Sequence, residues 1–242
     1  MPIEKIQGIV IDVIKHNDRH NVITLFTRTR GRMAFLSPVS SGKVGRMRNA
    51  RLLPLSVVEA DINIRQNREL QMLGAITPVE IWRDIYFNPV KSAITLFLSE
   101  FLNRYLRDSS PDATAWEFII ASIRALDNAK GKLANFHIWF LYRFLDIAGI
   151  APDMSEYEEG DSFDMRSGVP VVVDRIHRDI LTPEETSILM LLSRITLTNM
   201  HRYRFNGAER NSLLNRILRY YAIHFPGLSG LKSLDILSEV FS

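Results

Sequence analysis

Apolar and polar residues alternate in the first part of the chain with the two-residue period of β-strands. In the run 3–14, Ile9, Ile11 and Val13 share one face and Asp12 lies on the other. Four more short apolar runs follow, at residues 22–27, 33–36, 52–60 and about 69–75. Turn-forming residues separate these runs, so the pattern predicts a small antiparallel barrel of five short strands.

The period changes near Thr77 from two residues to the 3.6 residues of an α-helix. Apolar stripes typical of helices then cover residues 90–105, 116–123, 133–148, 188–197, 213–221 and 231–240. Two helix starts carry a capping-box pattern, with Thr182 three residues before Glu185 and Asn206 three residues before Glu209.

The two periods together predict an α+β chain. We expect a five-stranded OB-fold barrel at residues 1–78 and an all-α helical domain at residues 79–242, and a small open sandwich would fit the strand count nearly as well. An acidic, β-prone insert is expected at about 153–174. No flexible linker separates the two parts, which favours their packing together.

Composition narrows the classes of function. Hydrophobic residues make up 46% and charged residues 24% of the chain, as in ordinary folded proteins, and the net charge is +3. The absence of cysteine excludes disulfides, a thiol nucleophile and thiolate zinc sites. With no long apolar run and no apolar signal segment, we expect no membrane span and a cytoplasmic protein.

Positive charge is concentrated in the stretch from Arg28 to Arg51, which we call the basic segment. Its basic residues are Arg28, Arg30, Arg32, Lys43, Arg46, Arg48 and Arg51. The window without acidic residues is wider, from Arg19 to Val58. We expect a long loop here, and its field predicts a surface for a polyanion, most simply a nucleic acid. An exposed basic loop without a ligand is the alternative.

Aromatic residues near this charge have two interpretations. Phe26 and Phe35 lie on predicted strands, where they could stack on bases or fill the barrel core. The cluster at residues 201–205 combines basic and aromatic side chains between two helices, and it could extend a nucleic-acid surface or be an exposed connection.

No catalytic constellation is evident. Residues 40–43, Ser-Ser-Gly-Lys, resemble the end of a phosphate-binding loop, but Val44 stands where Ser or Thr would hold magnesium. None of the six histidines has a metal-ligand spacing with a carboxylate, and the acidic stretch 153–165 does not match a calcium loop. The sequence therefore predicts a binding protein that is not an enzyme and needs no cofactor.

Several segments, taken in order, resemble the bacterial DNA repair protein RecO family. They are Gly8 to Ile11, Val22 to Thr27, Gly31 to Met33, Gly42 to Arg48, and the helix end FLYRFLDIAGIAPD at 140–153. The resemblance covers nearly the whole chain, and its motifs are specific as an ordered set. Many members of this family carry a four-cysteine zinc motif after the last segment, which this chain lacks.

The resemblance implies an OB-fold that binds single- and double-stranded DNA and anneals complementary strands. It also implies a cytoplasmic, nucleoid-associated mediator of recombination. With RecR, and possibly RecF, the family helps RecA load onto DNA coated with single-stranded DNA-binding protein. It further implies a pocket in the helical domain for the acidic C-terminal tail of that coating protein.

The resemblance carries over to few residues. Lys43, Arg46 and Arg48 match the family's basic loop, and Arg28, Arg30 and Arg32 flank it on the predicted hairpin. Arg104 and Arg143 are candidates for contacting the acidic tail, because a tail that ends in a carboxylate beside an apolar residue needs a cation next to an apolar groove. A protein-interaction scaffold and an RNA-binding OB protein are the alternative functions.

Overall fold

The structure is a computed structural model that describes residues 4–39, 42–63, 70–107, 109–172 and 177–241. Ser40, Ser41, Glu69 and Asp174, which belong to the expected loop, strand and insert, lie outside the described residues. The chain forms two compact units. The first contains residues 1–128 and 231–237, and the second contains residues 129–230 and 238–242.

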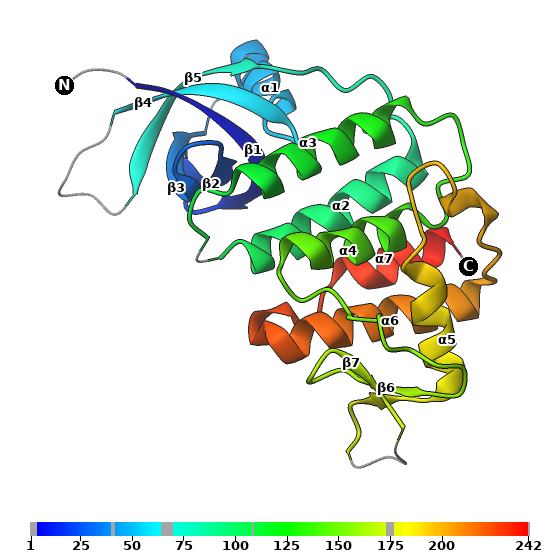
Figure 1. The fold of residues 1–242 in the computed structure, drawn as a ribbon. Coiled ribbons are helices and arrows are strands. Elements are labelled where there is room, and N and C mark those ends of the chain that lie inside the picture. The colour runs from blue at the N-terminus through cyan, green and yellow to red at the C-terminus, as the bar shows by residue number, and fades with distance from the viewer. Residues whose placement is uncertain (1–3, 40–41, 64–69, 108, 173–176, 242) are drawn as a thin grey trace. The chain divides into compact units, whose positions relative to one another are not determined.

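The first unit begins with a closed barrel of five strands, in the order β1-β2-β3-β5-β4. The strands are β1 (Glu4–Lys15), β2 (His20–Thr27), β3 (Gly31–Pro38), β4 (Val57–Asn63) and β5 (Gln71–Pro78). Figure 1 shows the barrel in blue and cyan, followed by the helices. The predicted fold class, an OB-type barrel followed by a helical part, is confirmed.

The barrel core comes from the inward faces of the alternating strands. Val10, Ile23 and Leu25 are completely buried. Phe35 belongs to the same core, and Phe26 is also completely buried. Neither ring is available for stacking on bases: Phe35 fills the barrel core as expected, whereas Phe26 packs against Trp116, with 6.1 Å between the ring centroids.

The β2–β3 hairpin turns at Gly31. Gly31 has a φ of +68°, which L side chains rarely adopt. A Cβ atom here would also collide with the backbone of Ser109 and Ser110. The Thr27 hydroxyl donates to the Gly31 carbonyl at 2.7 Å and accepts from the Arg30 amide at 3.1 Å, which closes the turn.

The expected basic loop is not a loop. Residues Gly42–Ala50 form helix α1, which begins at a glycine with a φ of +68° and carries Arg48 in its last turn. Among the α1 residues whose burial the structure describes, Gly45 is buried and Arg48 is half-buried. Neither residue is a sequence signal for the inner face of a helix, which is usually marked by a stripe of apolar residues.

Two long helices complete most of the first unit, α2 (Pro89–Tyr105) and α3 (Ala113–Asn128). Asn88 caps α2 through its side-chain oxygen, which accepts from the Val90 amide at 3.0 Å. The Ser99 hydroxyl of α2 donates to the Ile11 carbonyl of β1 at 2.6 Å, so α2 is joined directly to the barrel.

The second unit combines helices with a small sheet. Its elements are α4 (Phe136–Ile147), β6 (Ser162–Asp164), β7 (Val169–Val171), β8 (Ile180–Leu181), α5 (Pro183–Leu192), η1 (Met200–Arg202), α6 (Gly207–His224) and η2 (Pro226–Leu228). Helix α7 (Ser233–Val240) begins in the first unit and ends in the second. The predicted capping boxes at Thr182 and Asn206 are both present.

Candidate nucleic-acid interface

Helix α1 is anchored to the barrel by two arginines. Arg48 donates from Nε to the Ser37 hydroxyl at 3.0 Å and from Nη2 to the Leu73 carbonyl at 3.1 Å. Arg51 donates to the Ile76 carbonyl at 2.6 Å. Burial lowers the pKa of the Arg48 guanidinium, and the neighbouring charge of Arg51 lowers it further. Arginine nevertheless stays protonated in proteins, so both groups act as charged donors.

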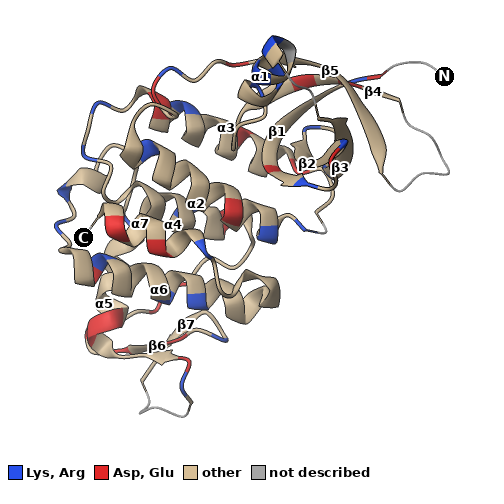
Figure 2. Cartoon of the chain, turned by 180° about the vertical axis from the view of Figure 1, so that it is seen from behind, with Lys and Arg blue, Asp and Glu red and all other residues tan. Residues whose placement is uncertain are grey.

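The outward side of α1 carries cations that do not bond to the barrel. Lys43 and Arg46 are exposed and three residues apart, which puts them on the same face of the helix. Figure 2 shows basic positions in blue on α1. Neither side chain has a hydrogen bond or ion pair with any described residue. We call these two residues the open cations. The apolar side chain of Met47 lies next to them and is 50% exposed.

The hairpin arginines have acidic partners from distant parts of the sequence. Arg30 makes a forked contact with the Glu4 carboxylate, with the shortest distance 2.8 Å. Arg28 lies 3.3 Å from the Glu117 carboxylate of α3. The basic segment has no acid of its own, but the fold neutralises part of it. Because both pairs are exposed, each contributes little and is weakened by salt.

Arg32 is tied to α2 in a different way. Its Nη2 donates to the Asn103 side-chain oxygen at 3.2 Å, and Asn103 in turn donates to the Asp12 carboxylate at 2.9 Å. The seven basic residues of the basic segment therefore fall into three groups. Lys43 and Arg46 are open, Arg28 and Arg30 are paired at the surface, and the other three hold parts of the protein together.

One cation that the sequence prediction did not single out belongs with the open ones. The carbonyl of Arg19 accepts from the Val39 amide at 2.8 Å, so Arg19 lies beside the chain that leads into α1. Its side chain is exposed and has no partner in the described part of the chain. The available signal was its position as the first residue of the acid-free window.

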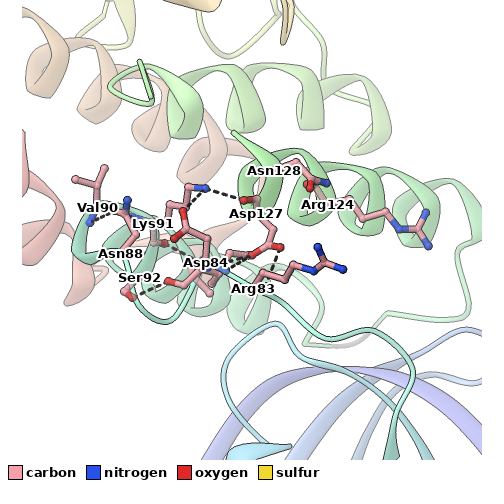
Figure 3. A network of polar contacts seen from close by, with 11 residues as sticks. Arg83, Asp84, Asn88, Val90, Lys91, Ser92, Arg124, Asp127 and Asn128 are labelled. Carbon is pink, nitrogen blue, oxygen red and sulfur yellow. Dashed lines mark hydrogen bonds and ion pairs between the residues drawn. The ribbon is translucent and has the colours of Figure 1, made fainter. Parts of the chain in front are cut away.

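In a second charged cluster of the same unit, the charged groups have partners within the protein. Lys91 of α2 is only 1% exposed; its ammonium lies 2.7 Å from the Asp84 carboxylate and donates to the Asp127 carbonyl at 2.7 Å. The Asp127 carboxylate accepts from the amides of Arg83, Asp84 and Ile85. Figure 3 shows these contacts, and we call Asp84, Lys91 and Asp127 the Lys91 network.

The acidity of Asp127 reflects this arrangement. Burial by itself would raise the pKa of Asp127, but the three backbone N–H donors and the charge of Lys91 outweigh it and lower the pKa. Asp127 therefore remains ionised at neutral pH. The network joins the segment that follows the barrel to the end of α3.

The two arginines expected to contact an acidic tail have partners within their own units. Arg104 of α2 pairs with Glu100 at 2.8 Å. Arg143 of α4 donates to the carbonyls of Ser193 and Ile195, both at 2.8 Å. Those carbonyls follow the end of α5, where carbonyl groups lack helical partners. Arg143 thus stabilises the end of α5.

The second unit contains an apolar cavity of about 360 Å³. Its apolar lining includes Leu145, Phe163, Leu181, Ile188, Phe205 and Leu213. Arg204 also lines it, and its exposed side chain has no partner among the described residues. The acidic residues at the cavity already have partners, since Glu185 pairs with Arg216, which also lines the cavity, and Glu209 belongs to the capping box of α6.

The residues present do not fit a thiolate zinc site, because the chain has no cysteine. In the part of the chain that the structure describes, no three His, Asp or Glu residues are grouped as metal ligands would be. Across the same residues, no helix has the length and apolarity to span a membrane.

Comparison with known proteins decides the family. Residues 1–82 match the family model described as Recombination protein O N terminal, and residues 86–235 match the model described as Recombination protein O C terminal. The chain belongs to the RecO family of DNA repair proteins. The resemblance noted in the sequence is thereby confirmed.

Relatives named DNA repair protein RecO match this chain over nearly its full length. The one from Phocaeicola vulgatus is 35% identical over 240 residues, which is 99% of this chain and 100% of the relative. The one from Porphyromonas gingivalis is 34% identical over 242 residues and covers 97% of this chain and 98% of the relative. The one from Flavobacterium johnsoniae is 27% identical over 239 residues.

Proposed function

We propose that this protein is a DNA-binding mediator of recombinational repair that acts without catalysing a reaction. It binds single- and double-stranded DNA, anneals complementary strands and, with RecR and possibly RecF, helps RecA load onto DNA coated with single-stranded DNA-binding protein. Membership of the RecO family supports the role in repair. The single observation that carries the DNA site is the pair of open cations on α1.

Annealing requires two polyanions to approach each other. Cations on a rigid barrel reduce the repulsion between strands by neutralising phosphates and releasing counterions. Lys43 and Arg46 supply this charge, and since neither has a partner among the described residues, binding DNA breaks no bond seen there. Arg19, whose carbonyl accepts from the Val39 amide, can add to it. Arg28 and Arg30 can join at the expense of weak surface ion pairs.

Strand annealing tests this proposal. Two complementary labelled oligonucleotides are mixed with the full-length protein, with and without single-stranded DNA-binding protein, and with the variant Lys43→Ala/Arg46→Ala. The wild type should accelerate annealing in both cases, and the variant should be slower in both. No acceleration by the wild type would contradict the proposal.

The two alternative functions give different results in binding assays. A protein-interaction scaffold would show little affinity for bare single-stranded DNA in a mobility shift. An RNA-binding OB protein would prefer RNA in competition with DNA of the same sequence at fixed salt. The DNA proposal requires measurable affinity for bare DNA and no preference for RNA.

For the acidic tail of single-stranded DNA-binding protein, we propose the apolar cavity of the second unit. The tail ends in a carboxylate beside an apolar residue, so it needs an apolar pocket with a free cation at its edge. Arg204 meets that requirement better than Arg104 or Arg143, which already have partners.

A peptide with the sequence of such a tail tests this assignment by calorimetry. Arg204→Ala should weaken peptide binding about tenfold, since a charged hydrogen bond is lost. Arg104→Ala, a matched loss of one arginine in the other unit, should leave peptide affinity within about twofold. Equal losses in both variants would contradict the choice of this cavity.

A further inference from the structure

The barrel has one weakly paired seam. Strands β2 and β3 pair over eight residues of each strand. Strands β3 and β5, which run parallel, share only the pairs Phe35–Gln71 and Leu36–Met72 among the described residues. Across the residues that the structure describes, the ladder does not hold β3 against β5 beyond these two pairs.

Arg48 bridges this seam with one side chain. Its Nε donates to Ser37 on β3 and its Nη2 donates to the carbonyl of Leu73 on β5, the residue that follows the last β3–β5 pair. Both acceptor residues are 2% exposed. A planar guanidinium suits two acceptors at fixed positions, whereas an ammonium offers a single point of charge. Arg51 adds one bond, to Ile76 on β5.

The Arg48 side chain projects from the side of α1 opposite to the open cations. Successive residues of a helix are about 100° apart, so Arg46 and Arg48 project about 200° apart around the axis of α1. A helix of nine residues is not stable by itself, and its orientation therefore depends on its anchors. Arg48 is the residue of α1 with bonds to both strands.

We propose that Arg48 is a positioning residue rather than a DNA contact. It holds α1 across the β3–β5 seam, so that Lys43 and Arg46 project from a fixed helix toward the phosphate backbone. This inference rests on the proposed DNA binding. It divides the basic segment into residues that touch DNA and residues that orient them.

The variant Arg48→Lys tests the inference, because it keeps the charge and removes the fork. Two quantities are measured on the full-length protein: amide hydrogen exchange of α1 without DNA, and affinity for single-stranded DNA across a series of salt concentrations. Exchange in α1 should rise about tenfold, the loss expected for one charged hydrogen bond. DNA affinity should fall severalfold, and the salt slope should stay the same because no cation has been removed.

Arg83→Lys is the matched control, since it makes the same exchange of side chain at an exposed arginine outside the basic segment. It should leave α1 exchange unchanged and DNA affinity within about twofold. Ser37→Ala, which removes one acceptor of Arg48, should give an intermediate rise in exchange. Its effect and that of Arg48→Lys should not add, because both break the same bond.

Two results would overturn the inference. One is unchanged α1 exchange in Arg48→Lys, which would mean that the fork does not hold the helix. The other is faster exchange with wild-type DNA affinity, which would make Arg48 a structural residue without influence on the site. If instead Lys43→Ala/Arg46→Ala binds DNA like the wild type, the proposed DNA site itself fails, whatever the exchange data for Arg48→Lys show.

Discussion

Helix α1 and the Lys91 network both place charged side chains within the first unit, but they differ in what those charges contact. In the Lys91 network the ammonium has two oxygen partners and the Asp127 carboxylate accepts three amides. On α1 the open cations have no partner among the described residues. Buried charge needs partners within the fold, whereas unpaired surface charge remains available to a ligand.

The comparison assigns different consequences to loss of charge in the two regions. A change in the Lys91 network should destabilise the fold and leave DNA affinity of the folded protein intact. A change in the open cations should lower DNA affinity and leave stability intact. The predictions below test this division, beginning with the largest effect.

Asp127→Ala should destabilise the protein by about 3 kcal/mol, because three amides lose their acceptor and Lys91 loses a nearby negative charge. Chemical denaturation of the full-length protein measures the loss. Asp127→Asn is the control, since its amide oxygen still accepts hydrogen bonds, and it should lose less than half as much. Equal losses in the two variants would contradict the role given to the carboxylate.

A charged network around Asp179 in the second unit makes stability depend on pH. Hydrogen bonds from Arg219 lower the pKa of Asp179 against the opposing effect of burial, and Arg166 lowers it further. The Asp179 carboxylate accepts hydrogen bonds from Arg166, in the turn between β6 and β7, and from Arg219 on α6. It therefore links this turn to α6. Stability from Asp179 is therefore present at neutral pH and is lost as the pH falls below about 4, through the lowered pKa.

Asp179→Asn should remove about 1 to 2 kcal/mol at neutral pH and flatten the fall in stability below about pH 4. Urea denaturation at a series of pH values measures both effects. Asp18→Asn, a change at an exposed acid, should retain the wild-type profile. If the stability of Asp179→Asn falls in acid as steeply as that of the wild type, other groups cause the pH dependence.

The smallest effect is expected at the paired surface cations. Glu4→Gln should release Arg30 and raise DNA affinity by less than about threefold, with stability changed by less than about 0.5 kcal/mol. Glu59→Gln changes the net charge equally but releases Lys5 instead. If both variants bind DNA equally well, the gain comes from net charge and not from Arg30.

The elements with local signals were predictable from the sequence. The period of two residues gave all five barrel strands, although the fourth begins at Val57 rather than at Leu52. The capping boxes at Thr182 and Asn206 gave the starts of α5 and α6 within a residue. Each of these signals lies within a few neighbouring residues, so no tertiary contact is needed to read it.

The features that were missed depend on contacts distant in sequence. Helix α1 was expected to be a loop because Gly42 and Gly45 interrupt the segment, and the contacts of Arg48 with Ser37 and Leu73 cannot be read from the sequence. The pairing of Arg28 with Glu117 joins residues 89 positions apart, and Lys91 meets Asp127 across 36 positions. A list of basic residues therefore gave the composition of the candidate site, while the fold determines which members are open.

The most direct test of the central claim is the slope of log K against log salt for single-stranded DNA, measured for the wild type and for Lys43→Ala/Arg46→Ala. Each phosphate contact contributes about 0.7 to that slope. The double variant should therefore have a slope smaller by about 1.4 and an affinity lower by about 25-fold near 0.1 M salt. A slope and an affinity equal to those of the wild type would contradict the claim that the open cations bind the DNA backbone.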